Sequence, residues 1–309
     1  MANKIKWPQG KTFAFTVVDD TDGATVENVR PVYQYLFEKG IFTTKTVWVY
    51  PSRDHYQGES LSDEGYRHFV QDLSKKGFEI GFHNAGSGGF TRDETLAALE
   101  FFKETLGFYP KLHINHGENE ENLYWGSKRF SPLFQKLYGR FKPTVHSRGD
   151  EKDSPYFWGD KAKEHITYIR NRVFRQVNTL QADNRFPTRE YGKDTYSNLW
   201  FSSSDGLRLS TFLSLLSKKN LDTLEKEGGV CIVYTHFGYD FVDEEGHLNQ
   251  GFKDTIDDLS ARNGWFVPAS ELLDFLQPRV DTSPSRFHAW KLDVKWLFQR
   301  AIHWPRSKE

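Results

Sequence analysis

Two acidic residues directly follow the first apolar run of the chain. Residues 11–18 read KTFAFTVV, a composition typical of a buried strand, and Asp19 and Asp20 come next. Adjacent carboxylates at the end of a buried strand are costly unless a cation, hydrogen bonds or a catalytic role compensates them. We therefore interpret the Asp19–Asp20 pair as functional. Asp22 is suited both to capping the next helix and to joining an oxygen-rich metal site.

Two histidines occupy comparable positions after later apolar runs. His83 ends the run GFEIGFH, and His236 ends the run VCIVYTH. One such histidine more often bonds to backbone than to a metal. Two of them, in a chain whose first strand ends in Asp-Asp, form a set that is able to bind a divalent metal and transfer a proton.

The elements that position these residues alternate between strands and helices. Strand-like runs and capped amphipathic segments follow each other at least three times before residue 117, and the alternation returns after residue 205. This order predicts parallel strands joined by crossover helices, with the site at the carboxyl ends of the strands. The strand-like runs that we expect cover residues 11–18, 42–50, 78–82, 111–116, 165–169, 198–202, 229–235 and 265–269.

The order of these motifs resembles the polysaccharide deacetylase family, the NodB-homology group of carbohydrate esterases. The matching pieces are the Asp19–Asp20 pair, the run GFEIGFH, the run VYTHFG and the closing segment GWFVPASELLDFL. The resemblance covers roughly residues 12–276. It implies an α/β fold, a distorted (β/α) barrel of about seven parallel strands, with long loops and a C-terminal amphipathic helix.

The resemblance also implies a chemistry, which is hydrolysis of an N-acyl group, such as N-acetyl, on an amino sugar. Asp19 would be the general base, and His236 would protonate the leaving amine. Asp20 and His83 would hold a divalent, zinc-like metal. A metal activates water and polarises an acyl oxygen, and an acid and a base must flank the carbonyl, so the residue types agree with this chemistry.

The chain departs from the family at two positions. Ser87 stands where a second histidine is usual, and the fourth strand reads HINHGEN where an arginine with prolines is usual. Three outcomes stay open: His116 replaces the missing metal ligand, Asp22 joins the site, or the fold works without a metal. Imidazole is a common ligand of such metals, which favours His116.

Polar and aromatic residues near these strand ends are candidates for substrate binding. We expect Asn115, Glu118, Asn119, Trp125 and Ser87 to contact a carbohydrate, although a solvated loop explains the residues after 117 equally well. The glycine-rich loop at residues 84–91 precedes a helix, an arrangement that favours an anion such as a phosphate on the substrate.

The domain prediction divides the chain into two parts. Residues 1–277 form the barrel, with a long-loop region at 118–205, and residues 278–309 form a linker and a basic tail. In that tail Trp290, Val294, Leu297, Ala301 and Trp304 share a helical face surrounded by basic residues. Such a helix suits a membrane surface, and it equally suits packing back on the domain.

Composition limits the remaining function classes. The net charge of −1 argues against general nucleic-acid binding, and the single cysteine excludes an internal disulfide or a multi-cysteine metal site. No signal-peptide-like or membrane-spanning run is present, so we expect a cytoplasmic protein that acts on a precursor glycan, for example one linked to phosphate or lipid. The alternatives are a metal-independent hydrolase of small amides and an inactive carbohydrate-binding or assembly protein.

Overall fold

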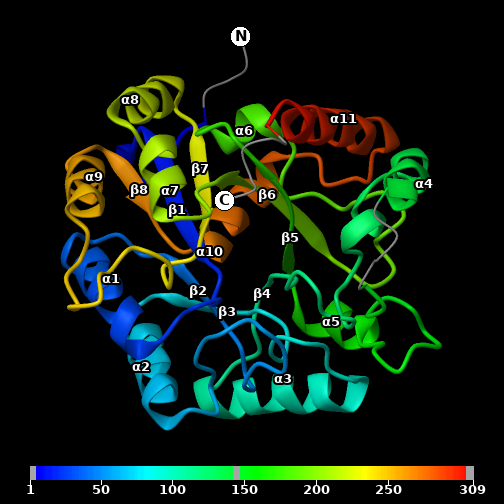
Figure 1. Ribbon diagram of the computed structural model, residues 1–309. Helices are drawn as coiled ribbons and strands as arrows, with labels where there is room; N and C mark the ends of the chain where they lie inside the picture. Colours follow the sequence, from blue (N-terminus) through cyan, green and yellow to red (C-terminus); the bar gives the residue numbers. More distant parts are fainter. Residues whose placement is uncertain (1–4, 142–146, 304–309) are drawn as a thin grey trace.

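The computed structural model describes residues 5–141 and 147–303, and Figure 1 shows a ring of strands surrounded by helices. Seven parallel strands pair in the order β2-β3-β4-β5-β6-β7-β1, and β1 also pairs with β2, which closes the ring. The prediction of a seven-stranded (β/α) barrel is therefore confirmed. The strands are β1 (Phe13–Asp19), β2 (Thr44–Val47), β3 (Glu79–Phe82), β4 (Leu112–His113), β5 (Tyr168–Phe174), β6 (Leu199–Asp205) and β7 (Val230–Thr235).

The barrel is distorted at the edge of β1 that faces β2. Only Val18 and Asp19 of β1 pair with β2, through Thr44 and Lys45. The first residues of β1 pair instead with an eighth strand, β8 (Gly264–Phe266). The barrel is thus splayed where β1 begins and closed where β1 ends, the end at which the candidate site residues lie.

Helices cover the outside of the ring, and their starts follow from local sequence. Thr25 and Asn28 form a capping box at the start of α1, and Thr91 and Glu94 form the predicted one at α3. The helices of the regular repeats are α1 (Val26–Glu38), α2 (Glu64–Lys75), α3 (Arg92–Leu106), α7 (Leu209–Leu215), α8 (Lys218–Glu227), α9 (Gln250–Ser260) and α10 (Ala269–Leu276).

Strand β1 is buried on both faces, as parallel strands in such folds are. Phe13, Phe15 and Val17 belong to one apolar cluster, and the alternating Ala14 and Val18 belong to a second one. The strand therefore holds a fixed position between the two halves of the core, and the acidic residues that follow it are held equally firmly.

The long-loop region at 118–205 contains two of the barrel strands, β5 and β6, which overlap the predicted runs at 165–169 and 198–202. It also contains short helical elements that the sequence did not reveal: η2 (Gly126–Arg129), α4 (Pro132–Phe141), α5 (Gly159–His165) and α6 (Thr179–Ala182). Two further 3-10 turns, η1 (Pro8–Gly10) and η3 (Gln277–Arg279), precede the barrel and follow α10.

The final helix, α11 (Arg286–His303), lies beside the end of β5 in Figure 1. Its residues Leu292 and Trp296 pack with Phe130 and Phe174 in a small apolar cluster, so one face of the helix docks on the barrel. Trp304, which the sequence placed on the apolar face of the tail, lies outside the described residues. Among the described helices, none has the length and apolar character needed to cross a bilayer.

Candidate active site

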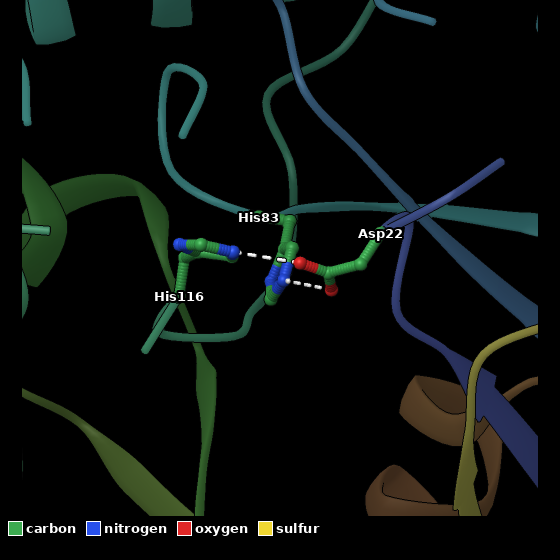
Figure 2. A group of neighbouring side chains, drawn as sticks. All are labelled: Asp22, His83 and His116. Atoms are coloured by element: carbon green, nitrogen blue, oxygen red, sulfur yellow. Dashed lines mark hydrogen bonds and ion pairs between the residues drawn. The ribbon is translucent and has the colours of Figure 1, made fainter. Parts of the chain in front are cut away.

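Three side chains from separate strand ends meet at the mouth of the barrel. Asp22 follows β1, His83 follows β3 and His116 follows β4, and all three are buried. The Nε2 atom of His116 lies 2.7 Å from one Asp22 oxygen, and the Nε2 atom of His83 lies 3.3 Å from the other (Figure 2). One carboxylate oxygen and two imidazole nitrogens within 4.8 Å of one another suit a divalent metal.

The second nitrogen of each histidine is already bonded to the protein. Nδ1 of His83 lies 3.1 Å from the carbonyl oxygen of Ile114, and Nδ1 of His116 lies 3.1 Å from Oδ1 of Asn119. A carbonyl oxygen only accepts, so the ring proton of His83 sits on Nδ1 and its Nε2 lone pair points into the site. The same orientation of a ligand imidazole by a partner behind it is general in metal sites.

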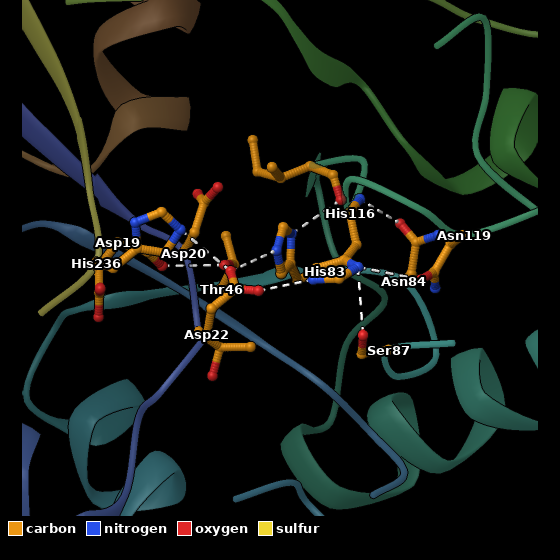
Figure 3. A network of polar contacts seen from close by, with 12 residues as sticks. Asp19, Asp20, Asp22, Thr46, His83, Asn84, Ser87, His116, Asn119 and His236 are labelled. Carbon is orange, nitrogen blue, oxygen red and sulfur yellow. Dashed lines mark hydrogen bonds and ion pairs between the residues drawn. The ribbon is translucent and has the colours of Figure 1, made fainter. Parts of the chain in front are cut away.

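The orientation of Asn119 fixes His116 in the same way. The Nδ2 atom of Asn119 donates to the carbonyl oxygen of Gly86 and to Oε1 of buried Glu121, so Oδ1 is the atom that faces His116. The ring proton of His116 therefore sits on Nδ1, and its Nε2 is free to accept. We predicted Asn119 to bind substrate, but the fully buried side chain instead lies behind a candidate ligand (Figure 3).

His236 approaches the same carboxylate from the end of β7. Its Nε2 lies 3.2 Å from Asp22, and its Nδ1 donates to the carbonyl oxygen of Leu207 at 3.2 Å. Three imidazoles thus direct nitrogen lone pairs at one carboxylate, and neutral imidazole offers that carboxylate no proton. Such a group of acceptors is stable only with a cation or with added protons in its midst.

The pKa values of Asp22, His116 and His236 are all shifted in the direction that favours positive charge beside a carboxylate. Burial alone would raise the pKa of Asp22, but the three histidines outweigh it and hold the pKa well below its usual value. Burial alone would lower the pKa of His116 and of His236, but Asp22 outweighs it, and both values are raised. Asp22 is therefore a carboxylate over the physiological range, ready to neutralise either a cation or a charged imidazole.

Asp20 lies beside this set and is held by an arginine. Arg170 on β5 donates to both Asp20 oxygens, one at 2.9 Å, and its guanidinium lies 4.2 Å from the ring centre of Tyr234. Asp20, Asp22 and His236 form a second group whose ligand atoms lie within 4.8 Å of one another. Asp20 was predicted to join His83 and His116 on a metal, but in the structure Asp22 is the carboxylate grouped with these two histidines.

Asp19, the predicted general base, turns away from the site. Its side chain is fully buried, with Oδ2 2.9 Å from both Lys45 Nζ and the Tyr33 hydroxyl and Oδ1 accepting from the amide of Phe237 at 2.8 Å. The assignment fails for a simple reason. Consecutive strand residues point to opposite faces, and the fixed strand β1 gives Asp20 the site-facing direction.

Two further predicted substrate residues are also structural. Ser87 is buried and donates to Asp54 at 2.8 Å, and its Oγ lies 3.5 Å from Nδ1 of His116 (Figure 3). Asn115 bonds to His113 and to the backbone of Leu123. Both side chains support the loops that hold His116 and have no surface to offer a sugar.

Backbone amides of the glycine-rich loop at residues 84–91 are already hydrogen-bonded within the protein. The amides of Gly88 and Phe90 donate to the side chains of Asn119 and Glu121, and the Thr91 amide donates to Glu94. These three donors are not free for a phosphate, so the anion-binding interpretation of this loop is wrong for them.

The solvent-facing wall of the site is aromatic. The ring centre of Tyr56 lies 4.7 Å from that of His116, and the ring centre of Tyr239 lies 5.3 Å from that of His236. Burial and nearby Asp22 raise the pKa of Tyr239 to about 12, so its hydroxyl keeps its proton. Of the predicted substrate residues, Glu118 is exposed and Trp125 half-buried on the loop after β4.

Comparison with known proteins adds the fold and no more. No family model matches the chain, and no curated protein matches it in sequence. Among solved structures, PuuE allantoinase aligns with a TM-score of 0.53 at 10% identity, over 88% of this chain and 92% of its own. A probable polysaccharide deacetylase from Pseudomonas aeruginosa PAO1 gives the same TM-score and identity, over 88% and 93%. This chain has their fold.

The sequence did not single out two residues of the site, Arg170 and Glu121, whereas Asp22 was one open alternative. Arg170 sits inside β5, in the segment that had no clear periodicity, and Glu121 lies in a loop of common polar residues. The only signal for Arg170 was a basic residue inside a buried strand, which needs an acidic partner.

Proposed function

We propose that this chain is a metal-assisted hydrolase that removes an N-acyl group, such as N-acetyl, from an amino sugar. The observation that carries the proposal is the set of Nε2 atoms of His83, His116 and His236 directed at Asp22. Asp22, His83 and His116 would hold the ion. A divalent ion of the zinc type supplies polarisation of the acyl oxygen and acidification of water.

The other side chains of the site supply acid and base. Asp20, held by Arg170, would accept a proton from the attacking water, the role predicted for Asp19 from the sequence. His236 is placed to donate a proton from Nε2 to the leaving amine, and its raised pKa favours the protonated form. The aromatic rings of Tyr56 and Tyr239 offer faces for a sugar ring.

The substrate class is the least constrained part of the proposal. A carbohydrate partner is supported by the fold of the probable polysaccharide deacetylase. The allantoinase with the same TM-score supports a small amide as the second candidate.

Metal analysis combined with an acetate-release assay tests the proposal. Untreated protein should hold about one divalent ion per chain and release acetate from a panel of N-acetylated amino sugars and chito-oligosaccharides. Asp22→Asn should lose both properties. Asp243→Asn is the matched control, since Asp243, Glu245 and His247 form a candidate metal group on the surface.

Each other result rejects a defined part of the proposal. Turnover without a metal would establish the metal-independent amide hydrolase, and turnover of allantoin alone would replace the sugar substrate. Bound metal and bound oligosaccharide without turnover would identify a carbohydrate-binding protein. Equal loss of metal in Asp243→Asn would move the metal to the surface group.

A further inference from the structure

Helix α11 presents two apolar faces, and only one of them touches the barrel. On the inner face, Ala289, Leu292 and Trp296 are buried. Asp293, also on this face, forms an ion pair with Arg172 of β5 at 2.7 Å. Lys295 donates to the carbonyl oxygen of Gln181 at 2.6 Å, which ties the helix to α6. The helix is therefore anchored and needs no partner in order to form.

The outer face carries a row of large apolar side chains in solvent. Phe287 is 68% exposed, Trp290 43%, Val294 39% and Phe298 65%. Their spacing of three or four residues places them on one side of the helix. The rings of Phe287 and Trp290 stack, with centres 6.1 Å apart. Four such residues in a row are a contiguous patch, which marks an interaction surface more strongly than scattered exposed residues do.

The charges beside this row are of one sign. Arg286 and Lys291 are exposed on α11 at the two sides of the row, whereas the only acidic residue of the helix, Asp293, is buried and paired with Arg172. A row of phenylalanine and tryptophan bordered by cations alone is complementary to a surface that combines apolar chains with negative charge. An anionic lipid bilayer has that composition.

A second copy of the chain is a poorer occupant of this face. The helix of 18 residues is about 27 Å long and about 10 Å wide, so its outer face covers about 270 Å². A stable interface buries about 800 Å² on each partner. A twofold contact would also place the same cations opposite one another, because it joins identical patches.

We propose that the outer face of α11 binds the surface of membranes that contain anionic lipids. The helix lies parallel to the bilayer, with Phe287, Trp290 and Phe298 inserted at the level of the headgroups and Arg286 and Lys291 beside the lipid phosphates. This inference does not depend on the proposed chemistry of the barrel. It accounts for an apolar row that the fold leaves uncovered.

Vesicle co-sedimentation of the full chain tests the apolar contribution. The protein should sediment with vesicles of 30% phosphatidylserine and 70% phosphatidylcholine, and at least about tenfold less with phosphatidylcholine alone. Phe287→Ser/Phe298→Ser should weaken binding at least about tenfold. The matched control is Phe37→Ser/Phe108→Ser, which replaces two phenylalanines, each 42% exposed, on other helices and loops. Equal sedimentation of the two variants would overturn the proposal.

Charge reversal tests the lipid selectivity. Arg286→Glu/Lys291→Glu should lose the preference for phosphatidylserine, whereas Lys218→Glu/Lys219→Glu on α8 should keep it. Circular dichroism and urea unfolding check that each variant is folded. Light scattering in solution tests the alternative, which is self-association. If the original chain is a dimer that Phe287→Ser/Phe298→Ser dissociates, and if it binds no vesicles, the outer face is a dimer interface and the membrane proposal is rejected. Vesicle binding and acetate release are separate readouts, so either proposal can fail alone.

Discussion

Asp19 and Lys45 form a fully buried ion pair at the point where the barrel closes. Lys45 is one of the two residues through which β2 pairs with β1, and Asp19 also accepts from Tyr33 on α1 and from the Phe237 amide after β7. One carboxylate therefore joins four segments of the chain. Burial alone would lower the pKa of Lys45, but Asp19 outweighs it and the pKa is raised, so the ammonium depends on that carboxylate for its charge.

Replacing Asp19 should therefore lower the free energy of unfolding more than it affects the reaction at the site. Asp19→Asn leaves the Lys45 ammonium buried without a counter-charge, and we expect a loss of about 3–5 kcal/mol in the free energy of unfolding. Urea unfolding measures this loss, and Asp19→Asn/Lys45→Met should recover part of it. The folded fraction should still bind the metal. An unchanged unfolding midpoint with abolished turnover would instead restore Asp19 as the general base.

The error over Asp19 shows what residue types and spacing can predict. The sequence pointed to the segment from Asp19 to Asp22 and to His83, His236 and, as one of three open outcomes, His116, and the structure brings these side chains together. It did not decide which of Asp19, Asp20 and Asp22 faces the site. That choice depends on the direction of β1 at its last residue and on Lys45 and Arg170, which arrive from β2 and β5.

At the scale of elements, a second buried ionic network connects β5 with α11. Arg172 on β5 pairs with Asp293 on α11 at 2.7 Å and with Glu190 at 2.6 Å, and Glu190 also pairs with Lys193. Burial alone would raise the pKa of Glu190, but Arg172 and Lys193 outweigh it and lower the pKa to about 2. This network places α11 on the barrel by specific charges in addition to apolar contact.

The depressed pKa of Glu190 predicts an acid-sensitive contribution to stability. A carboxyl with a pKa near 2 when folded and near 4.5 when unfolded stabilises the fold by about 3 kcal/mol at pH 7, and by about 1 kcal/mol at pH 3. The contribution is complete above the unfolded pKa and is lost as the pH falls toward 2. Glu190→Gln should therefore differ from the original chain more at pH 7 than at pH 3, as measured by urea unfolding.

A surface control separates this effect from general acid denaturation. Glu245→Gln changes an exposed carboxyl and should differ little from the original chain at either pH. A gap between Glu190→Gln and the original chain that stays constant from pH 7 to pH 3 would contradict the predicted role of Glu190. The quantity compared is the difference in free energy of unfolding between each variant and the original chain at the same pH, so the contributions of other titrating groups cancel.

Regular elements were predictable and irregular ones were not, for a physical reason. Helices such as α3 carry capping boxes and an apolar stripe within one short window, so local sequence determines them. Elements η2, α4, α5 and α6 are short and depend on contacts with distant residues, such as Asp293 of α11, which accepts from the Ser131 amide at the start of α4. Contacts across more than 160 residues leave no local periodicity.

For the whole molecule, a cation at Asp22, His83 and His116 would join the ends of three strands of one closed ring. These residues are 61 and 33 positions apart along the chain, so the ion would act as a cross-link that the unfolded chain lacks. A ligand that binds only the folded state stabilises it by about 2.7 kcal/mol when present at a hundred times its dissociation constant. At this end of the barrel β1 pairs with β2 through two residues and β3 pairs with β4 through one, so such a link matters most there.

Removal of the metal should therefore lower the melting temperature of the whole barrel. We expect chelator-treated protein to melt about 5 °C lower than metal-loaded protein, by the usual relation between free energy and melting temperature, and to recover when zinc or cobalt is restored. His83→Ala should remove the metal-dependent shift, because it deletes a ligand whose Nε2 faces Asp22. His247→Ala, in the exposed group with Asp243 and Glu245, should keep the shift. If His247→Ala removes the shift in melting temperature and His83→Ala retains it, the stabilising ion lies at the surface group. If the original chain shows no shift, no ion binds at Asp22, and added protons alone satisfy the three imidazoles around it.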